Sequence, residues 1–129
     1  MVNGREIGLL GEKIAGQYLK NSGYAILQFN YRDRCGEIDI IAIDQDKILT
    51  FFEVKTRTSG KFGSPEESVT AKKQLKILKT VDSFIKENAV FLYHKYHIDV
   101  ISVQLNFLTR KARIKHIKNA ISDISFEGE

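Results

Sequence analysis

Two apolar runs joined by a short polar segment constrain the fold of this chain more than any other feature. Residues 37–43 and 48–55 are rich in isoleucine, phenylalanine and valine, and residues 44–47 between them read Asp-Gln-Asp-Lys. This pattern is typical of two strands in a β-hairpin. Both alternating faces of these strands carry large apolar side chains, as happens in a sheet that is covered on both sides. We therefore expect the hairpin to lie centrally in a sheet with both faces packed.

The length of the hairpin loop decides which side chains share a face. A three-residue loop at 45–47 pairs Asp44 with Ile48, whereas a two-residue loop would give another register. Alternation then places Ile38 on the face of Ile40 and the charged residues on the opposite face. Counting back from the first pair also predicts two facing pairs, which are Asp39 with Glu53 and Glu37 with Lys55.

Two amphipathic segments predict helices that cover this sheet. Residues 4–20 carry apolar side chains at helical spacing and are followed by an Asn-Ser-Gly stop signal. A second helix is expected to begin either at Ser64, which Pro65 follows, or at Thr70, and to reach about Lys86. The expected buried residues are Ile7, Leu10, Ile14, Ala15, Tyr18 and Leu19 in the first helix, and Ala71, Leu75, Leu78, Val81 and Ile85 in the second.

The remaining apolar runs predict further strands. They comprise residues 24–29, 89–93 and 96–105, with residues 112–117 as a candidate last strand. The resulting order α-β-β-β-α-β-β indicates an α/β protein with a central mixed sheet flanked by helices. The chain shows no repeat, linker or low-complexity tract, so residues 1–129 are expected to form a single domain.

Composition narrows the cellular setting. Cys35 is the single cysteine, and no Cys or His grouping has zinc spacing, which favours a reducing compartment. Residues 1–6 lack the pattern of a signal peptide, and no run approaches the roughly 18 apolar residues of a membrane span. We expect a cytoplasmic protein without a membrane segment. The formal net charge of +4 permits a nucleic-acid partner without identifying one.

Charged residues interrupt the apolar pattern of the hairpin. In the expected register, the Cβ atoms of Asp39 and Glu53 lie about 5 Å apart, near enough for both carboxylates to bind one cation. Such a pair needs a neutralising partner, which is a divalent metal, Lys55 or both. Oxygen ligands without Cys or His favour Mg²⁺ or Mn²⁺ over zinc. Lys55 could orient or deprotonate a water and offset charge on a phosphate, so the pattern indicates phosphodiester hydrolysis.

The same charged residues also have a purely structural interpretation. They would then be ordinary cross-strand pairs at the wet end of a hairpin, each worth at most about 1 kcal/mol. An acid, a second acid and a lysine two residues later form a short pattern that arises often by chance. The spacing alone leaves both interpretations open.

Longer stretches resemble a known family. Residues 36–41, Gly-Glu-Ile-Asp-Ile-Ile, and residues 51–57, Phe-Phe-Glu-Val-Lys-Thr-Arg, resemble the YraN-like family of small bacterial proteins, assigned to the PD-(D/E)XK nuclease superfamily. The resemblance covers most of the chain. It extends to Gly11, Glu12 and Ala15, to residues 62–65, to Lys72, and to Ile98, Asp99 and Val100.

The resemblance implies a restriction-endonuclease-like fold with a metal site. In that fold Asp39 and Glu53 would bind the metal, Lys55 would be the catalytic lysine, and the Val54 carbonyl would add a ligand. Glu12 would be a further catalytic acid, although a solvated helix glutamate is an equal alternative. The family's similarity to archaeal Holliday-junction resolvases implies branched DNA as a substrate, and cutting two strands would make a homodimer natural.

Two positions depart from the family pattern. Ile38 stands where the superfamily's name has proline. His97 stands where the resemblance leads us to expect arginine, which implies a weaker phosphate contact at this position. His94 and His97 lie three residues apart on a strand or loop, where their side chains point to opposite faces and make a poor metal pair.

Basic residues are candidates for nucleic-acid binding. Arg57 and Lys61 follow Lys55 closely and are best placed to contact phosphates near the metal. Lys72 and Lys76 share one edge of the second helix with Lys79 and Lys86, an edge that either tracks a phosphate backbone or is simply solvated. A second basic cluster contains Arg110, Lys111, Arg113, Lys115 and Lys118.

Three functions follow as hypotheses. The first is an Mg²⁺- or Mn²⁺-dependent DNA endonuclease built on Asp39, Glu53 and Lys55. The second is a nucleic-acid-binding or assembly module that keeps the fold and the acids but does not cut. The third is a protein-interaction domain, which strong salt-dependent DNA binding would exclude.

Overall fold

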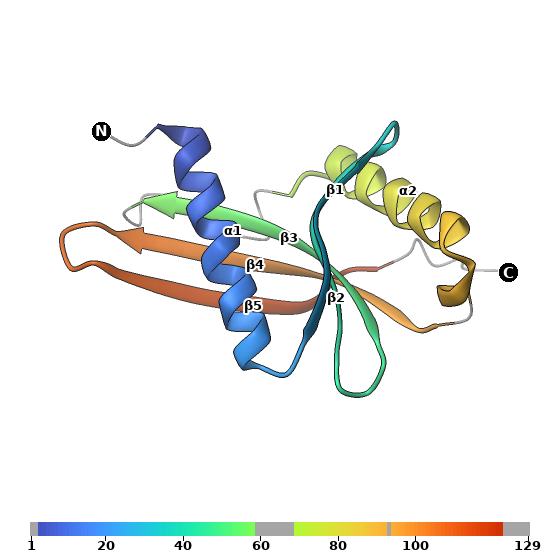
Figure 1. The fold of residues 1–129 in the computed structure, drawn as a ribbon. Helices are drawn as coiled ribbons and strands as arrows, with labels where there is room; N and C mark the ends of the chain where they lie inside the picture. Colours follow the sequence, from blue (N-terminus) through green and yellow to red (C-terminus); the bar gives the residue numbers. More distant parts are fainter. Residues whose placement is uncertain (1–2, 59–68, 93, 123–129) are drawn as a thin grey trace, which may run out of the picture.

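The computed structural model describes residues 3–58, 69–92 and 94–122 (Figure 1). The elements follow the predicted order α-β-β-β-α-β-β, with one short 3₁₀ turn added after the second helix. Their bounds are α1 Gly4–Asn21, β1 Ala25–Asp33, β2 Gly36–Ile43, β3 Leu49–Thr58, α2 Ala71–Glu87, η2 Ala89–Phe91, β4 Tyr96–Asn106 and β5 Lys111–Ile121.

The strands within the described residues form one mixed sheet in the order β1-β2-β3-β4-β5. Neighbouring strands are antiparallel except β3 and β4, which are parallel because α2 carries the chain back across the sheet. This arrangement confirms the predicted α/β fold with a central mixed sheet flanked by helices. No helix in the described part of the chain is long and apolar enough to cross a membrane.

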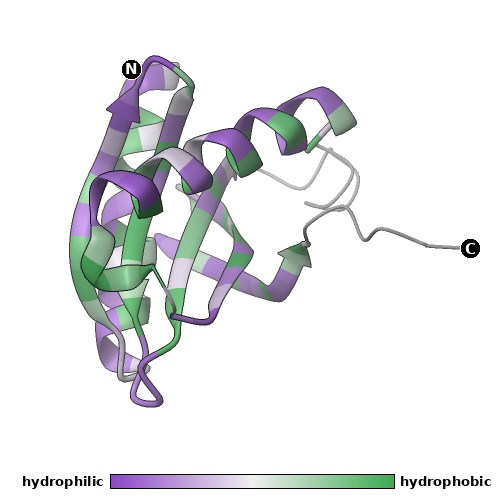
Figure 2. Ribbon diagram, turned by 90° about the vertical axis from the view of Figure 1, so that its right-hand side faces the viewer, coloured by the Kyte–Doolittle hydropathy of each residue, from purple (hydrophilic) through white to green (hydrophobic). Residues whose placement is uncertain are grey.

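The two long helices cover opposite faces of the sheet. Ala15 and Leu19 of α1 pack with Ile40 and Phe52, in a core shared with β4. A second core joins α2 to the other face, where the neighbouring residues of the same strands point; its members include Ile41, Phe51, Ile77, Val81 and Phe84. Along both helices, hydrophilic and hydrophobic segments alternate, as this one-sided packing requires (Figure 2).

The hairpin between β2 and β3 has the predicted register. Ile43 pairs with Leu49, and the Asp44 N–H donates to the Ile48 carbonyl at 3.1 Å. The turn is fixed by Asp44, whose Oδ1 accepts the N–H groups of Asp46 and Ile48. A side chain inside the loop therefore sets the register of the strands on either side.

Both helices begin at side-chain caps. Asn3 caps α1 through a reciprocal pair of hydrogen bonds with Glu6. Thr70 caps α2 by accepting the Lys73 N–H, so the later of the two predicted starts is where the helix begins. Ser64, the earlier predicted start, lies outside the described residues.

The predicted buried stripes are partly wrong. In α2 the buried residues are Ile77, Thr80, Val81 and Phe84, whereas Ala71 is exposed and Leu75 is 46% exposed. Phe84 sets this rotation by packing edge-to-face on Tyr31 and Phe51. In α1, Leu10 is exposed, and small residues, Gly11 and Gly16, are buried instead.

The strand predicted at 89–93 is also wrong. Residues Ala89–Phe91 form the 3₁₀ turn η2, in which Val90 is 76% exposed while Phe91 stacks on Phe84. A five-residue apolar run can form either a buried strand or a turn with one buried aromatic side chain, and the sequence pattern does not distinguish the two. The candidate strand at 112–117 is confirmed and lies within the longer β5.

Candidate active site

The sheet opens at Asp39. Pairing between β2 and β3 runs from Ile43 and Leu49 to Ile40 and Phe52 and then stops. Asp39 and Glu53 are the next facing positions, and the Asp39 Oδ2 accepts the Val54 N–H at 2.7 Å. A side-chain carboxylate thus takes a hydrogen bond that a backbone carbonyl takes in a continuous ladder. Beyond this point the two strands are not paired with each other.

Strict alternation fails at the same residue. Ile38 packs in the core on the α2 side, while Ile40 packs on the α1 side, so the predicted shared face is wrong for Ile38. The predicted pairing of Glu37 with Lys55 is also wrong. Glu37 instead accepts a hydrogen bond from Arg32 of β1 at 2.8 Å, because it lies beyond the last β2–β3 pair.

Glu53 is at the centre of a charged cluster. It is 7% exposed, and its Oε2 lies 3.3 Å from the Lys55 Nζ. A second ammonium group, the Lys73 Nζ of α2, lies 2.6 Å from the same oxygen. Lys55 therefore lies beside Glu53, together with one additional lysine, and the Asp39 carboxylate binds the backbone next to Glu53.

Burial and like charge control protonation in this cluster. Burial, followed by the negative charge of Glu53, raises the pKa of Asp39 to about 7, against the hydrogen bond from the Val54 N–H. Burial and the neighbouring Lys73 ammonium lower the pKa of Lys55. Burial also opposes the charged form of Lys73, but the hydrogen bonds with Glu53 and Lys55 and the negative charges of Glu53 and Asp39 together outweigh burial and raise the Lys73 pKa. Burial is therefore the main reason that Asp39 keeps its proton up to about neutral pH.

The donor atoms fit a hard divalent cation. Asp39 and Glu53 offer carboxylate oxygens, and Mg²⁺ commonly binds through one or two carboxylates while waters or substrate phosphates complete its shell. Within the described residues, no group of three or more His, Cys, Asp or Glu side chains is arranged to hold a metal ion. Two carboxylates can hold Mg²⁺ when waters or a substrate phosphate supply its remaining ligands, so a third protein carboxylate is not required.

Glu12 lies where α1 passes the open end of the sheet. Its pKa is raised by burial and by the negative charges of Glu37 and Glu53, while a hydrogen bond with Asn30 opposes the shift. The close approach of α1 depends on Gly11, because a Cβ there would lie 1.8 Å from the Thr56 Oγ1. Glu12 therefore interacts electrostatically with Asp39 and Glu53, and its catalytic role stays a prediction.

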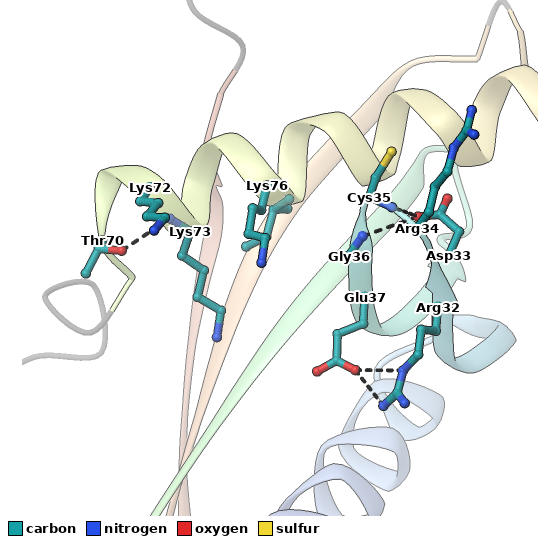
Figure 3. Close-up of a pocket in the computed structure, with 11 residues that line it drawn as sticks. Arg32, Asp33, Arg34, Cys35, Gly36, Glu37, Thr70, Lys72, Lys73 and Lys76 are labelled. Carbon is teal, nitrogen blue, oxygen red and sulfur yellow. Dashed lines mark hydrogen bonds and ion pairs between the residues drawn. The ribbon is translucent and has the colours of Figure 1, made fainter.

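The predicted nucleic-acid contacts lie in different places. Arg57 is half-buried on β3, two residues beyond Lys55. Lys72 and Lys76 of α2 line a cleft next to the acid pair (Figure 3). Lys61 lies outside the described residues.

Comparison with known proteins identifies the family. The model of the uncharacterised protein family UPF0102 matches residues 11–103. The chain belongs to this family. UPF0102 proteins of Clostridium botulinum (strain Loch Maree) and Alkaliphilus oremlandii are each 48% identical to it, covering 90% of this chain and 94% and 97% of theirs. The family resemblance inferred from the motifs is thereby confirmed.

A solved structure is also similar to the UPF0102 chain. It is the crystal structure of a repair endonuclease from Pyrococcus abyssi, with 15% sequence identity and a TM-score of 0.38. The match covers 72% of this chain and 35% of the endonuclease chain.

Sequence reasoning missed Lys73 of this UPF0102 member. The signal was its position four residues before Ile77 and seven before Thr80, which puts a lysine on the buried face of α2. A lysine on a buried stripe calls for an acidic partner, and Glu53 is that partner.

A second buried polar group was also missed. The His116 Nε2 lies 2.7 Å from the Asp99 Oδ2, and its Nδ1 lies 2.9 Å from the Tyr18 hydroxyl. The other Asp99 oxygen accepts the Asn119 N–H at 2.7 Å, beside a bulge in β5. This network ties α1 to β4 and β5 on the face away from α2.

Proposed function

We propose that this UPF0102 protein is a metal-dependent endonuclease that hydrolyses phosphodiester bonds in DNA. The observation that carries the proposal is the meeting of Asp39, Glu53 and Lys55 where β2 and β3 separate. Ordinary surface pairs do not bury a glutamate to 7% exposure or raise an aspartate pKa to about 7. An acid pair at an unpaired strand end therefore favours a reactive site over a structural one.

Each residue has a chemical part in the proposed reaction. Asp39, Glu53 and the Val54 carbonyl would hold Mg²⁺ or Mn²⁺, which would polarise the scissile phosphate and acidify a bound water. The lowered pKa of Lys55 increases the fraction of neutral amine that can accept a proton from the attacking water, and its ammonium form offsets charge on the phosphate. Lys73, once displaced from Glu53, would remain within reach of the same phosphate.

Branched DNA is the proposed substrate class, following the family's similarity to Holliday-junction resolvases. One site of this kind cuts one strand, so paired cuts across a junction would need two copies of the chain. We therefore include a homodimer in the proposal.

A cleavage screen tests the proposal. Purified protein is incubated with branched, flapped and single-stranded DNA in Mg²⁺, in Mn²⁺ and in EDTA. We expect metal-dependent cutting that Glu53→Gln or Lys55→Ala abolishes and that Lys20→Ala, at an exposed position of α1, leaves intact. Equal cutting by the wild type and the two site variants would assign the activity to a contaminant and refute the proposal.

One observation favours a second candidate, a nucleic-acid-binding or assembly module that does not cut. Lys55 and Lys73 already lie within ion-pair distance of Glu53, so part of the acid charge is neutralised without a metal. Salt-dependent DNA binding that survives Asp39→Asn, with no cleavage in any metal or substrate, would support this candidate over the endonuclease.

A further inference from the structure

A basic cleft lies beside the acid pair. It has a volume of about 540 Å³ and separates the turn between β1 and β2 from the first turns of α2 (Figure 3). Its basic lining residues are Arg32, Arg34, Lys72, Lys73 and Lys76, and its acidic ones are Asp33 and Glu37. The lining thus has more positive than negative side chains.

The acidic groups of this cleft are already bound. The Asp33 carboxylate accepts the N–H groups of Cys35 and Gly36 and the Tyr31 hydroxyl, and Glu37 is paired with Arg32. Among the described residues, Lys72 and Lys76 have no acidic partner, in contrast to Lys73. Their charge is therefore available to an anion from outside.

The cleft leads directly to the proposed reaction centre. Lys73 lines it, and the Nζ of that lysine lies 2.6 Å from the Glu53 Oε2. Figure 3 shows the Lys73 side chain extending from α2 toward the strands, while Lys76 projects into the space between α2 and the turn. An anionic strand that lies along the cleft would therefore pass beside Lys73 and the Glu53 that it contacts.

We propose that this cleft binds the phosphates of one nucleic-acid strand next to the scissile bond, through Lys72 and Lys76. The volume is that of a small-ligand site, which suits a few phosphates of one strand rather than a duplex. None of the described lining residues is aromatic, so bases have no stacking platform and binding is independent of sequence. The inference rests on the proposed function, because it takes the acid pair as the place of the scissile phosphate.

Binding without metal separates this inference from cleavage. A fluorescein-labelled 20-nucleotide single strand is titrated with protein in EDTA, from 50 to 300 mM KCl, and anisotropy is recorded. The cleft variant is Lys72→Gln with Lys76→Gln. The matched control is Lys13→Gln with Lys20→Gln, which removes two charges from exposed positions of α1 outside this cleft.

We expect the cleft variant to bind at least tenfold more weakly at 100 mM KCl and to lose about 1.4 from the slope of log affinity against log salt. The control should keep the wild-type slope. Equal losses in both variants, or no binding by the wild type, would overturn the cleft assignment. Tighter binding of the matching duplex, or of phosphatidylglycerol vesicles, would overturn the single-strand assignment.

The cleavage screen and the binding titration can fail separately. Cleft-dependent binding by a protein that never cuts would refute the endonuclease and leave the cleft assignment standing. Metal-dependent cutting, combined with wild-type binding by the cleft variant, would support the endonuclease and refute the cleft assignment.

Discussion

Asp39 makes the free energy of unfolding depend on pH in a direction unusual for a carboxylate. Its pKa is about 7 in the folded chain, against 3.8 for an ordinary aspartate. Between these values the folded state holds a proton that the unfolded state has lost, so stability falls as pH rises. A tenfold change in proton affinity is worth about 1.4 kcal/mol, so the whole window costs about 4 kcal/mol, with about 3 kcal/mol of it between pH 5 and 8.

Urea unfolding of the wild type and Asp39→Asn in EDTA measures this term. Asparagine keeps an oxygen that can accept the Val54 N–H but does not titrate. We expect the stability of the variant relative to the wild type to increase by about 3 kcal/mol from pH 5 to pH 8. The difference in free energy of unfolding between the two proteins cancels the contributions of titrating groups that do not contact Asp39. A difference that stays constant across this range would show that Asp39 ionises normally and would refute the buried acid pair.

Two further predictions concern the rest of the molecule. His116→Ala leaves one oxygen of Asp99, which is 2% exposed, without its imidazole partner and should lower the free energy of unfolding by about 1–3 kcal/mol in urea; an unchanged free energy of unfolding would contradict this hydrogen bond. Gly11→Ala should lower the free energy of unfolding by about 1–3 kcal/mol, because the new Cβ would lie 2.7 Å from the Cβ of Thr56. Gly8→Ala is the control and should not destabilise the chain, because nothing lies within 4 Å of its Cβ. Equal effects of the two substitutions would show that α1 does not approach β3 closely.

Features set by neighbouring residues were predictable from the sequence. The hairpin register followed because Asp44 fixes a three-residue turn by hydrogen bonds to residues two and four positions away. The start of α2 was one of two predicted positions, and a threonine cap marks it. The acid pair was predictable for the same reason, since the register alone places Asp39 opposite Glu53.

Features set by distant contacts were not predictable in this way. The rotation of α2 depends on the contacts of Phe84 with Tyr31 and Phe51. Until that rotation is known, spacing does not tell which residues of α2 face the sheet, so the exposure of Leu75 and the contact of Lys73 with Glu53 were not predicted. The Tyr18–His116 contact joins residues 98 positions apart. Pattern and propensity carry no information about pairs at such separations.

Two departures from the expected sequence patterns lie next to the proposed site: the break in strand alternation at Asp39 and the lysine at position 73 on the sheet-facing side of α2. Alternation breaks at Asp39 because its side chain binds the Val54 N–H, and this ends the β2–β3 ladder. The open ladder leaves room for Lys73 to reach Glu53 from α2, which requires a lysine on a helix face that is otherwise buried. Burying the Asp39 carboxylate costs stability, and the Lys73 ammonium, on a side chain that is 42% exposed, is partly desolvated beside Glu53. A fold selected for stability alone would place apolar residues at these two positions, so their charges argue for a function at this end of the sheet.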